Sequence, residues 1–77
     1  MRMDMRKLVG GNVRRARVRK GLTQEEFAVK SGFSQQYISD LERGLRNPTV
    51  VTLFELAQAL DTKPIELLRP PRSVKAR

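Results

Sequence analysis

Hydrophobic residues recur at helical spacing along most of the chain, and no segment alternates apolar with polar residues as a half-buried strand would. Capping residues and glycines divide this pattern into shorter units. The pattern predicts helices over residues 5–20, 24–31, 35–43, 50–60 and 64–68. An all-α fold follows, and 77 residues allow one small domain.

Polar caps and glycines set the predicted helix ends. Thr23, followed three residues later by Glu26, is typical of a capping box at the start of helix 24–31. Ser34 and Thr49 are expected to cap the next two helices, and a glycine follows each of the first three. The pair Gly10-Gly11 weakens the first half of helix 5–20 by about 1 kcal/mol per residue relative to alanine. The start of this helix is therefore left open.

The apolar positions of these helices predict a packed core without a ligand pocket. In helix 5–20 the residues that can face inward are Leu8, Val9, Val13, Ala16 and, at times, Val18. The apolar stripe of helix 50–60 consists of Val50, Leu53, Leu56, Ala57 and Leu60. The expected central core is Leu22, Phe27, Ile38, Leu41, Leu53, Leu56 and Leu60, with Phe27 and Phe33 flanking the turn between the second and third helices.

The residue types exclude several kinds of chemistry. The chain has no cysteine and no histidine, which argues against a disulfide framework, a zinc site and Cys or His nucleophiles. No paired carboxylates share a helix face, and Ser31, Ser34 and Ser39 have no base to activate them. We therefore expect a protein that is not an enzyme and uses no metal or other cofactor.

The net charge is +8, and it is concentrated at the two ends of the sequence. Residues 1–20 contain eight Lys or Arg and one acid, residues 69–77 contain four bases and no acid, and residues 21–68 contain four bases and seven acids. A basic chain favours a polyanionic partner, nucleic acid before anionic membrane. No apolar run approaches the roughly 20 residues of a membrane helix, and the N-terminus lacks the apolar stretch of a signal peptide. We therefore expect a cytoplasmic protein without a membrane partner.

Gln35 and Gln36 stand side by side at the start of helix 35–43. Two adjacent glutamines are compatible with an ordinary solvated surface. Each glutamine amide also carries a donor beside an acceptor, and adenine offers the complementary pair in the major groove of DNA. The surrounding sequence decides between these two interpretations.

Four short stretches follow one another in order: GLTQEEFA at 21–28, SGFS at 31–34, ISDLERG at 38–44 and NPT at 47–49. On these residues, and on the leucines that continue to residue 68, the chain resembles the helix-turn-helix domain of lambda-repressor/Cro-type regulators, also called the xenobiotic-response-element family. The resemblance covers about residues 8–68. It implies a compact five-helix bundle over residues 1–69, with the helix-turn-helix pair at about 24–43. It also implies that helix 35–43 is the recognition helix and lies in the major groove.

The resemblance gives the polar residues of this pair their expected roles. The candidates for base contacts are Gln35, Gln36, Tyr37, Ser39 and Asp40. The candidates for DNA backbone contacts are Gln24, Arg43, Arg46, Asn47 and, from the first helix, Arg14, while about half of that helix's bases are expected to face solvent. In the family, an arginine at the position of Arg17 pairs with a glutamate at that of Glu42, which implies a structural ion pair.

These roles favour a sequence-specific transcriptional regulator of double-stranded DNA, acting as a repressor or autoregulator. A homodimer on an inverted repeat would compensate for the few bases that one domain contacts, and its expected interface is Phe54, Asp61, Ile65 and Leu68. The sequence leaves open a phage-type repressor, a restriction–modification controller or an antitoxin. The alternative is an antitoxin or coactivator-like module whose main partner is a protein, such as a toxin or a polymerase. The basic segment 70–77 is expected to lie outside the fold as a disordered tail.

Overall fold

Four α-helices and one short 3₁₀-helix make up the computed structural model, which describes residues 4–71. The elements are α1 (Met5–Arg19), α2 (Gln24–Ser31), α3 (Gln35–Glu42), α4 (Val50–Ala59) and η1 (Pro64–Leu67). The expected all-α class is confirmed, but the expectation of five α-helices is wrong in its last member. Segment 64–68 closes with bonds between residues three apart, since Glu66 N donates to Lys63 O and Leu68 N donates to Ile65 O. Residues 72–77 of the predicted tail lie outside the described residues.

The helix ends follow the caps that the sequence contains. Thr23 Oγ1 accepts from Glu26 N at 3.0 Å, and Glu26 Oε1 accepts from Thr23 N at 2.8 Å, so the capping box is complete. Ser34 Oγ accepts from Tyr37 N at 3.0 Å at the start of α3. The turn between α2 and α3 passes through Gly32 at φ +85°, a conformation that L side chains rarely adopt.

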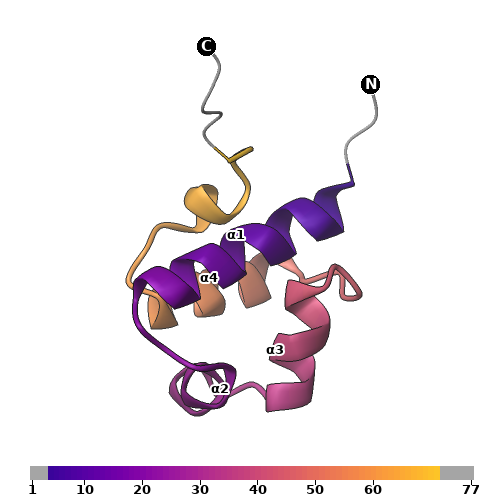
Figure 1. The fold of residues 1–77 in the computed structure, drawn as a ribbon. Helices are drawn as coiled ribbons and strands as arrows, with labels where there is room; N and C mark the ends of the chain where they lie inside the picture. The colour runs from indigo at the N-terminus through magenta and orange to yellow at the C-terminus, as the bar shows by residue number, and fades with distance from the viewer. Residues whose placement is uncertain (1–3, 72–77) are drawn as a thin grey trace.

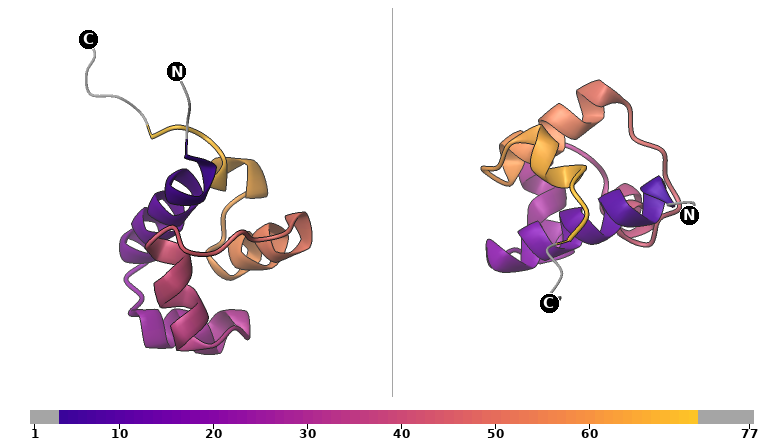
Figure 2. Two further views of the ribbon diagram at one scale, coloured as in Figure 1. Left: turned by 90° about the vertical axis from the view of Figure 1, so that its right-hand side faces the viewer. Right: turned by 90° about the horizontal axis from the view of Figure 1, so that it is seen from above.

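Helix α1 lies between η1 on one side and the α2–α3 pair on the other. Figure 1 shows η1 above α1 and the α2–α3 pair below it, with α2 seen end-on and α3 seen from the side. The view from above in Figure 2 shows η1 lying over α4, and these two elements are in contact. Helices α3 and η1 are therefore on opposite sides of α1.

One hydrophobic core joins all five elements. Its largest fully buried side chains are Phe27, Ile38, Leu41, Leu56, Leu67 and Val13. Leu22 and Phe33 are only partly buried, but both pack against this core. Two expected inward positions are wrong: Val50 is 82% exposed because it is the first residue of α4, and Val18 is exposed on the outer face of α1. Sequence reasoning missed Leu67, whose burial depends on the docking of η1.

Helix α1 continues without interruption through Gly10-Gly11 from a cap at Asp4. At Gly10 the helix passes directly against the end of α3, where an added Cβ would lie 2.2 Å from the backbone oxygen of Leu41. At Gly11 an added Cβ would meet only the guanidinium of Arg15, at 3.3 Å. The first glycine therefore permits a close contact between helices, and the second does not.

The buried side chain of Asn12 holds the C-terminal segment on α1. Its Nδ2 donates to Leu67 O at 2.9 Å and to Arg69 O at 2.7 Å. Its Oδ1 accepts from Arg15 Nη2 at 2.6 Å. Three of the hydrogen bonds available to this amide are thus made, and two of them satisfy carbonyl groups at the end of η1 and just beyond it. No feature of the sequence pointed to this role.

The two glycines allow a matched test of the close contact. We expect Gly10→Ala to lower the free energy of unfolding by about 1–3 kcal/mol, because the new methyl group must displace the α3 backbone. We expect Gly11→Ala to be neutral or to stabilise by up to about 1 kcal/mol, because alanine favours the helix. Urea unfolding followed by circular dichroism measures both. Equal effects of the two substitutions would contradict the contact.

Candidate nucleic-acid interface

Helix α3 buries one face and exposes the other. Ile38 and Leu41 are buried in the core, while Gln35 and Gln36 are exposed at the first turn. Ser39 and Asp40 lie one turn further along and are partly buried. The five residues predicted to contact bases all lie on this helix, and the two glutamines are at its solvent-exposed N-terminal end.

Asp40 connects the polar residues of this surface. Its Oδ1 accepts from Gln36 Nε2 at 2.8 Å and lies 3.4 Å from Arg43 Nη2. Its Oδ2 lies 3.5 Å from Arg46 Nη2. Pairs of this kind at a surface contribute about 0–1 kcal/mol each, so their main effect here is on orientation. The carboxylate holds one predicted base contact and two predicted backbone contacts in a single cluster.

Tyr37 supplies an aromatic support for the same cluster. Its ring stacks on Phe33 with centroids 5.0 Å apart, and the Arg46 guanidinium carbon lies 5.1 Å from its centroid. The cationic group is thus held between an aromatic face and the Asp40 carboxylate. Partial burial raises the pKa of the Tyr37 hydroxyl, an effect that the nearby charge of Arg46 opposes. The phenol stays neutral at physiological pH and can act as a hydrogen-bond donor.

The end of α3 is joined to α1 and α2 through the carboxylate of Glu42. Arg17 Nε donates to Glu42 Oε2 at 2.6 Å, and Arg17 Nη2 donates to Oε1 at 3.0 Å. Gln24 Nε2 donates to the same Oε1 at 3.0 Å, and Arg17 Nη1 donates to Leu22 O at 2.8 Å. The Glu42 side chain is 2% exposed. Arg17 and Glu42 therefore form a buried bidentate ion pair, and Gln24, a predicted phosphate contact, also connects α2 to α3.

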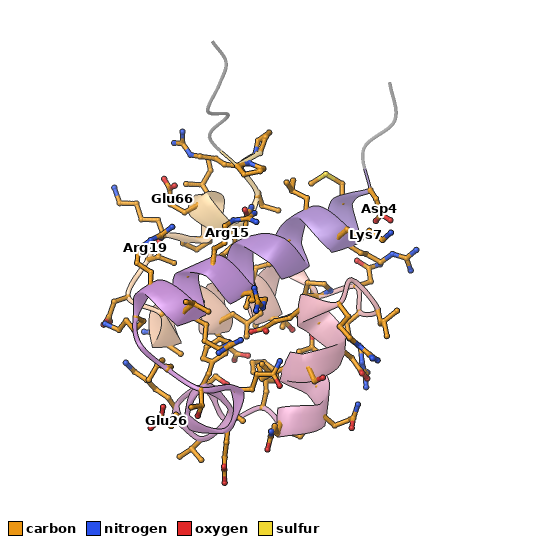
Figure 3. All side chains as sticks on the ribbon, in the orientation of Figure 1. Asp4, Lys7, Arg15, Arg19, Glu26 and Glu66 are labelled. Carbon is orange, nitrogen blue, oxygen red and sulfur yellow. The ribbon has the colours of Figure 1, made fainter. Side chains whose placement is uncertain are left out.

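The remaining predicted backbone contacts differ in their surroundings. Arg14 and Asn47 are exposed, and Asn47 lies in the loop that follows α3. Arg15 and Arg19 of α1 turn away from α3, and Figure 3 shows them beside Glu66 on the η1 side. No sequence pattern indicated the Arg46–Tyr37 contact, because it requires the chain to fold back after Gly44.

The helix-turn-helix family model matches residues 13–67. The chain belongs to this family of DNA-binding transcriptional regulators. The resemblance to lambda-repressor/Cro-type domains is thereby confirmed.

Relatives of this regulator cover nearly the same length. The uncharacterized HTH-type transcriptional regulator y4dJ of Sinorhizobium fredii is 68% identical over 68 residues, which are 88% of each chain. The control protein C.SmaI of Serratia marcescens is 42% identical over 86% of this chain and 79% of its own. The solved structure of the restriction–modification controller C.AhdI from Aeromonas hydrophila superposes with a TM-score of 0.77 at 42% identity, over 80% of this chain and 94% of that one.

The predicted dimer residues of this helix-turn-helix regulator lie on α4, on η1 and next to them. Phe54 is 53% exposed and Ile65 is 55% exposed, and Leu68 is also exposed. Asp61 differs from them, because its carboxylate pairs with Lys20. This hydrogen bond and the charge of Lys20 lower the pKa of Asp61, so it is ionised at neutral pH. Three of the four residues thus offer apolar surface and the fourth is charged.

Within residues 4–71, no helix is both long and apolar enough to cross a membrane. The same residues contain no group of three or more acidic, His or Cys side chains placed to hold a metal ion.

The ion pair at the end of α3 can be tested by removing Arg17. We expect Arg17→Ala to lower the free energy of unfolding by about 3 kcal/mol, because it leaves the buried Glu42 carboxylate without its main partner. Arg14→Ala, which removes an exposed arginine from the same helix, should change stability by less than about 0.5 kcal/mol. Thermal and urea unfolding of both variants measure the difference. If Arg17→Ala is as stable as the wild type, the negative charge of the Glu42 carboxylate does not depend on Arg17 for its stabilisation.

Proposed function

We propose that this helix-turn-helix regulator binds an inverted-repeat operator as a homodimer, with α3 of each copy in the major groove. The observation that carries the proposal is the arrangement at the start of α3. Gln35 and Gln36 are exposed there, and Asp40 accepts a hydrogen bond from the Gln36 amide. The N-terminal residues of a recognition helix are those that contact base edges.

The Gln36 amide can contact adenine while Asp40 holds it. An amide nitrogen has two hydrogens, of which one is donated to Asp40 Oδ1. The second hydrogen and Oε1 are available, and adenine presents an N7 acceptor beside an N6 donor in the major groove. Asp40 then acts as a positioning residue for Gln36. Asp40 therefore has an indirect role in base recognition, in place of the direct base contact expected from the sequence.

Phosphate contacts would come from the residues around this centre. Arg43 and Arg46 flank Asp40, and Asn47 follows them in the loop. Gln24 lies at the first turn of α2, where free backbone N–H groups and the helix dipole favour an anion. Arg14 would add a contact from α1. These contacts fix the position of the domain on the duplex, and they do not depend on the base sequence.

Two copies are needed because one recognition helix is short. Eight residues of α3 extend over about 12 Å, so a single domain contacts few base pairs. A two-fold dimer would place two such helices about one turn of DNA apart. The exposed Phe54, Ile65 and Leu68 supply apolar surface for that interface. Occupancy of such an operator near a promoter would repress transcription, including that of the regulator's own gene.

The role of Asp40 gives a test of base recognition. Selection of bound duplexes from a random pool should return a palindromic motif for the wild type. We expect Gln36→Ala to lose about 1–3 kcal/mol of discrimination at one base pair of each half-site. Asp40→Ala should lose part of the same discrimination while general affinity rises, because a negative charge near phosphate is removed.

A double-mutant cycle gives the decisive comparison for this pair. If Asp40 acts through Gln36, the Gln36→Ala/Asp40→Ala variant should discriminate no worse than Gln36→Ala alone. Gln35→Ala serves as the matched variant, since Gln35 makes no hydrogen bond to Asp40 among the described residues. If the losses of base discrimination in the two single variants add up in the double variant, Asp40 makes a base contact of its own. Sequence-blind binding by the wild type would instead favour a protein partner.

The dimer interface can be tested by placing a charge on the apolar surface. Sedimentation equilibrium should show a concentration-dependent dimer for the wild type. We expect Ile65→Asp to be monomeric and folded, because an exposed position accepts the carboxylate in the monomer but the interface does not. Val29→Asp is the control, since Val29 is an exposed apolar residue of α2 outside the proposed face. A dimer that survives Ile65→Asp would place the interface elsewhere.

A further inference from the structure

A cleft of about 570 Å³ lies between α1 and the segment that contains η1. Arg15 and Arg19 line it from α1, and Glu66 and Arg69 line it from the η1 side, while Pro70-Pro71 forms part of its wall. Figure 3 shows Arg15, Arg19 and Glu66 gathered at this place. The volume is within the range of about 300–1,000 Å³ that is common for small-molecule sites.

The charges around the cleft are not balanced. Glu66 Oε2 lies 3.2 Å from Arg69 Nε, so these two side chains neutralise one another. Arg15 donates to the neutral amide of Asn12 at 2.6 Å. Within residues 4–71 neither Arg15 nor Arg19 forms an ion pair with a carboxylate. Two guanidinium groups therefore give the cleft a net positive charge.

Arg15 has a defined orientation because Asn12 holds it. The Asn12 amide is buried and uses its nitrogen to bind Leu67 O and Arg69 O. Its oxygen is therefore fixed in place and directs the Arg15 guanidinium beside the cleft. A preorganised arginine loses less conformational entropy when it binds a ligand than a free surface arginine does.

The cleft is separate from the proposed DNA interface. Two residues along an α-helix are about 200° apart around its axis, so Arg19 projects from the opposite side of α1 to Arg17, which contacts α3. Figure 1 likewise shows η1 and the α2–α3 pair on opposite sides of α1. A ligand in the cleft would therefore not compete directly with DNA in front of α3.

We propose that this cleft binds a small multivalent anion that carries phosphate groups. Guanidinium groups bind phosphate oxygens through two parallel N–H bonds. An anion between Arg15 and Arg19 would relieve the repulsion between them, and Arg69 would bind it from the η1 side. The ligand would join α1 to the segment that carries Ile65 and Leu68. The site does not depend on DNA recognition, so it can be tested separately from the proposed function.

Titration of the 77-residue chain with inorganic pyrophosphate, followed by NMR of backbone amides, tests the site. At about 150 mM salt, where weak surface attraction is screened, we expect saturable shifts at Ala16, Thr62 and Arg69. Arg19→Gln should weaken binding roughly tenfold, because it removes one charged partner from the phosphate. Arg6→Gln removes the same charge from the first turn of α1, away from the cleft, and should leave pyrophosphate affinity unchanged. Circular dichroism of both variants checks that they are folded.

Three results would overturn the proposal. Equal loss of affinity in Arg6→Gln and Arg19→Gln would show a general effect of net charge. Shifts confined to Arg43, Arg46 and Asn47 would place the anion on the DNA interface. Shifts at Ala16 and Thr62 that appear with duplex DNA but not with pyrophosphate would make the cleft a contact for the DNA backbone.

Discussion

The buried ion pair between Arg17 and Glu42 is the interaction on which the position of the recognition helix depends. Glu42 is the last residue of α3, and its carboxylate accepts hydrogen bonds from α1 through Arg17 and from α2 through Gln24. Three helices therefore meet at one carboxylate, whose burial requires that its partners stay in place. The contact is possible because Gly10 lets the α1 backbone approach Leu41 O closely. A helix held in this way at its C-terminal end presents its N-terminal residues in a defined direction.

The two carboxylates of α3, Asp40 and Glu42, lie on different sides of the helix and make different contacts. Glu42 lies under the helix and contributes to its packing, while Asp40 lies on the other side and is partly exposed. The hydrogen bonds of Asp40 are made with Gln36, Arg43 and Arg46, all of which are candidates for DNA contacts. Such surface pairs contribute little to stability. If these residues contact DNA as proposed, their orientation in the free protein would reduce the entropy lost on binding.

The basic charge of the chain is divided by α1 into two surfaces. Arg43 and Arg46 belong to the α3 side, together with the exposed Arg14. Arg15, Arg19 and Arg69 surround the cleft on the η1 side. The net charge of +8 therefore does not describe a single DNA-binding face. Under the two proposals, α1 separates a surface for DNA on the α3 side from a site for a small anion on the η1 side.

The sequence by itself determined the four α-helices and the turn between α2 and α3. The helix ends depend on hydrogen bonds and backbone angles within a few residues, at Thr23 with Glu26, at Gly32 and at Ser34. Their effect could therefore be predicted from the local sequence alone. The apolar period likewise predicted Phe27, Ile38, Leu41 and Leu56 as core. Only the tertiary structure decided the role of Gly10, the hydrogen bonds of Asn12, the burial of Leu67 and the cleft beside Arg15. Each depends on a segment distant in sequence that lies against α1, and a pattern within one helix carries no information about which segment that is.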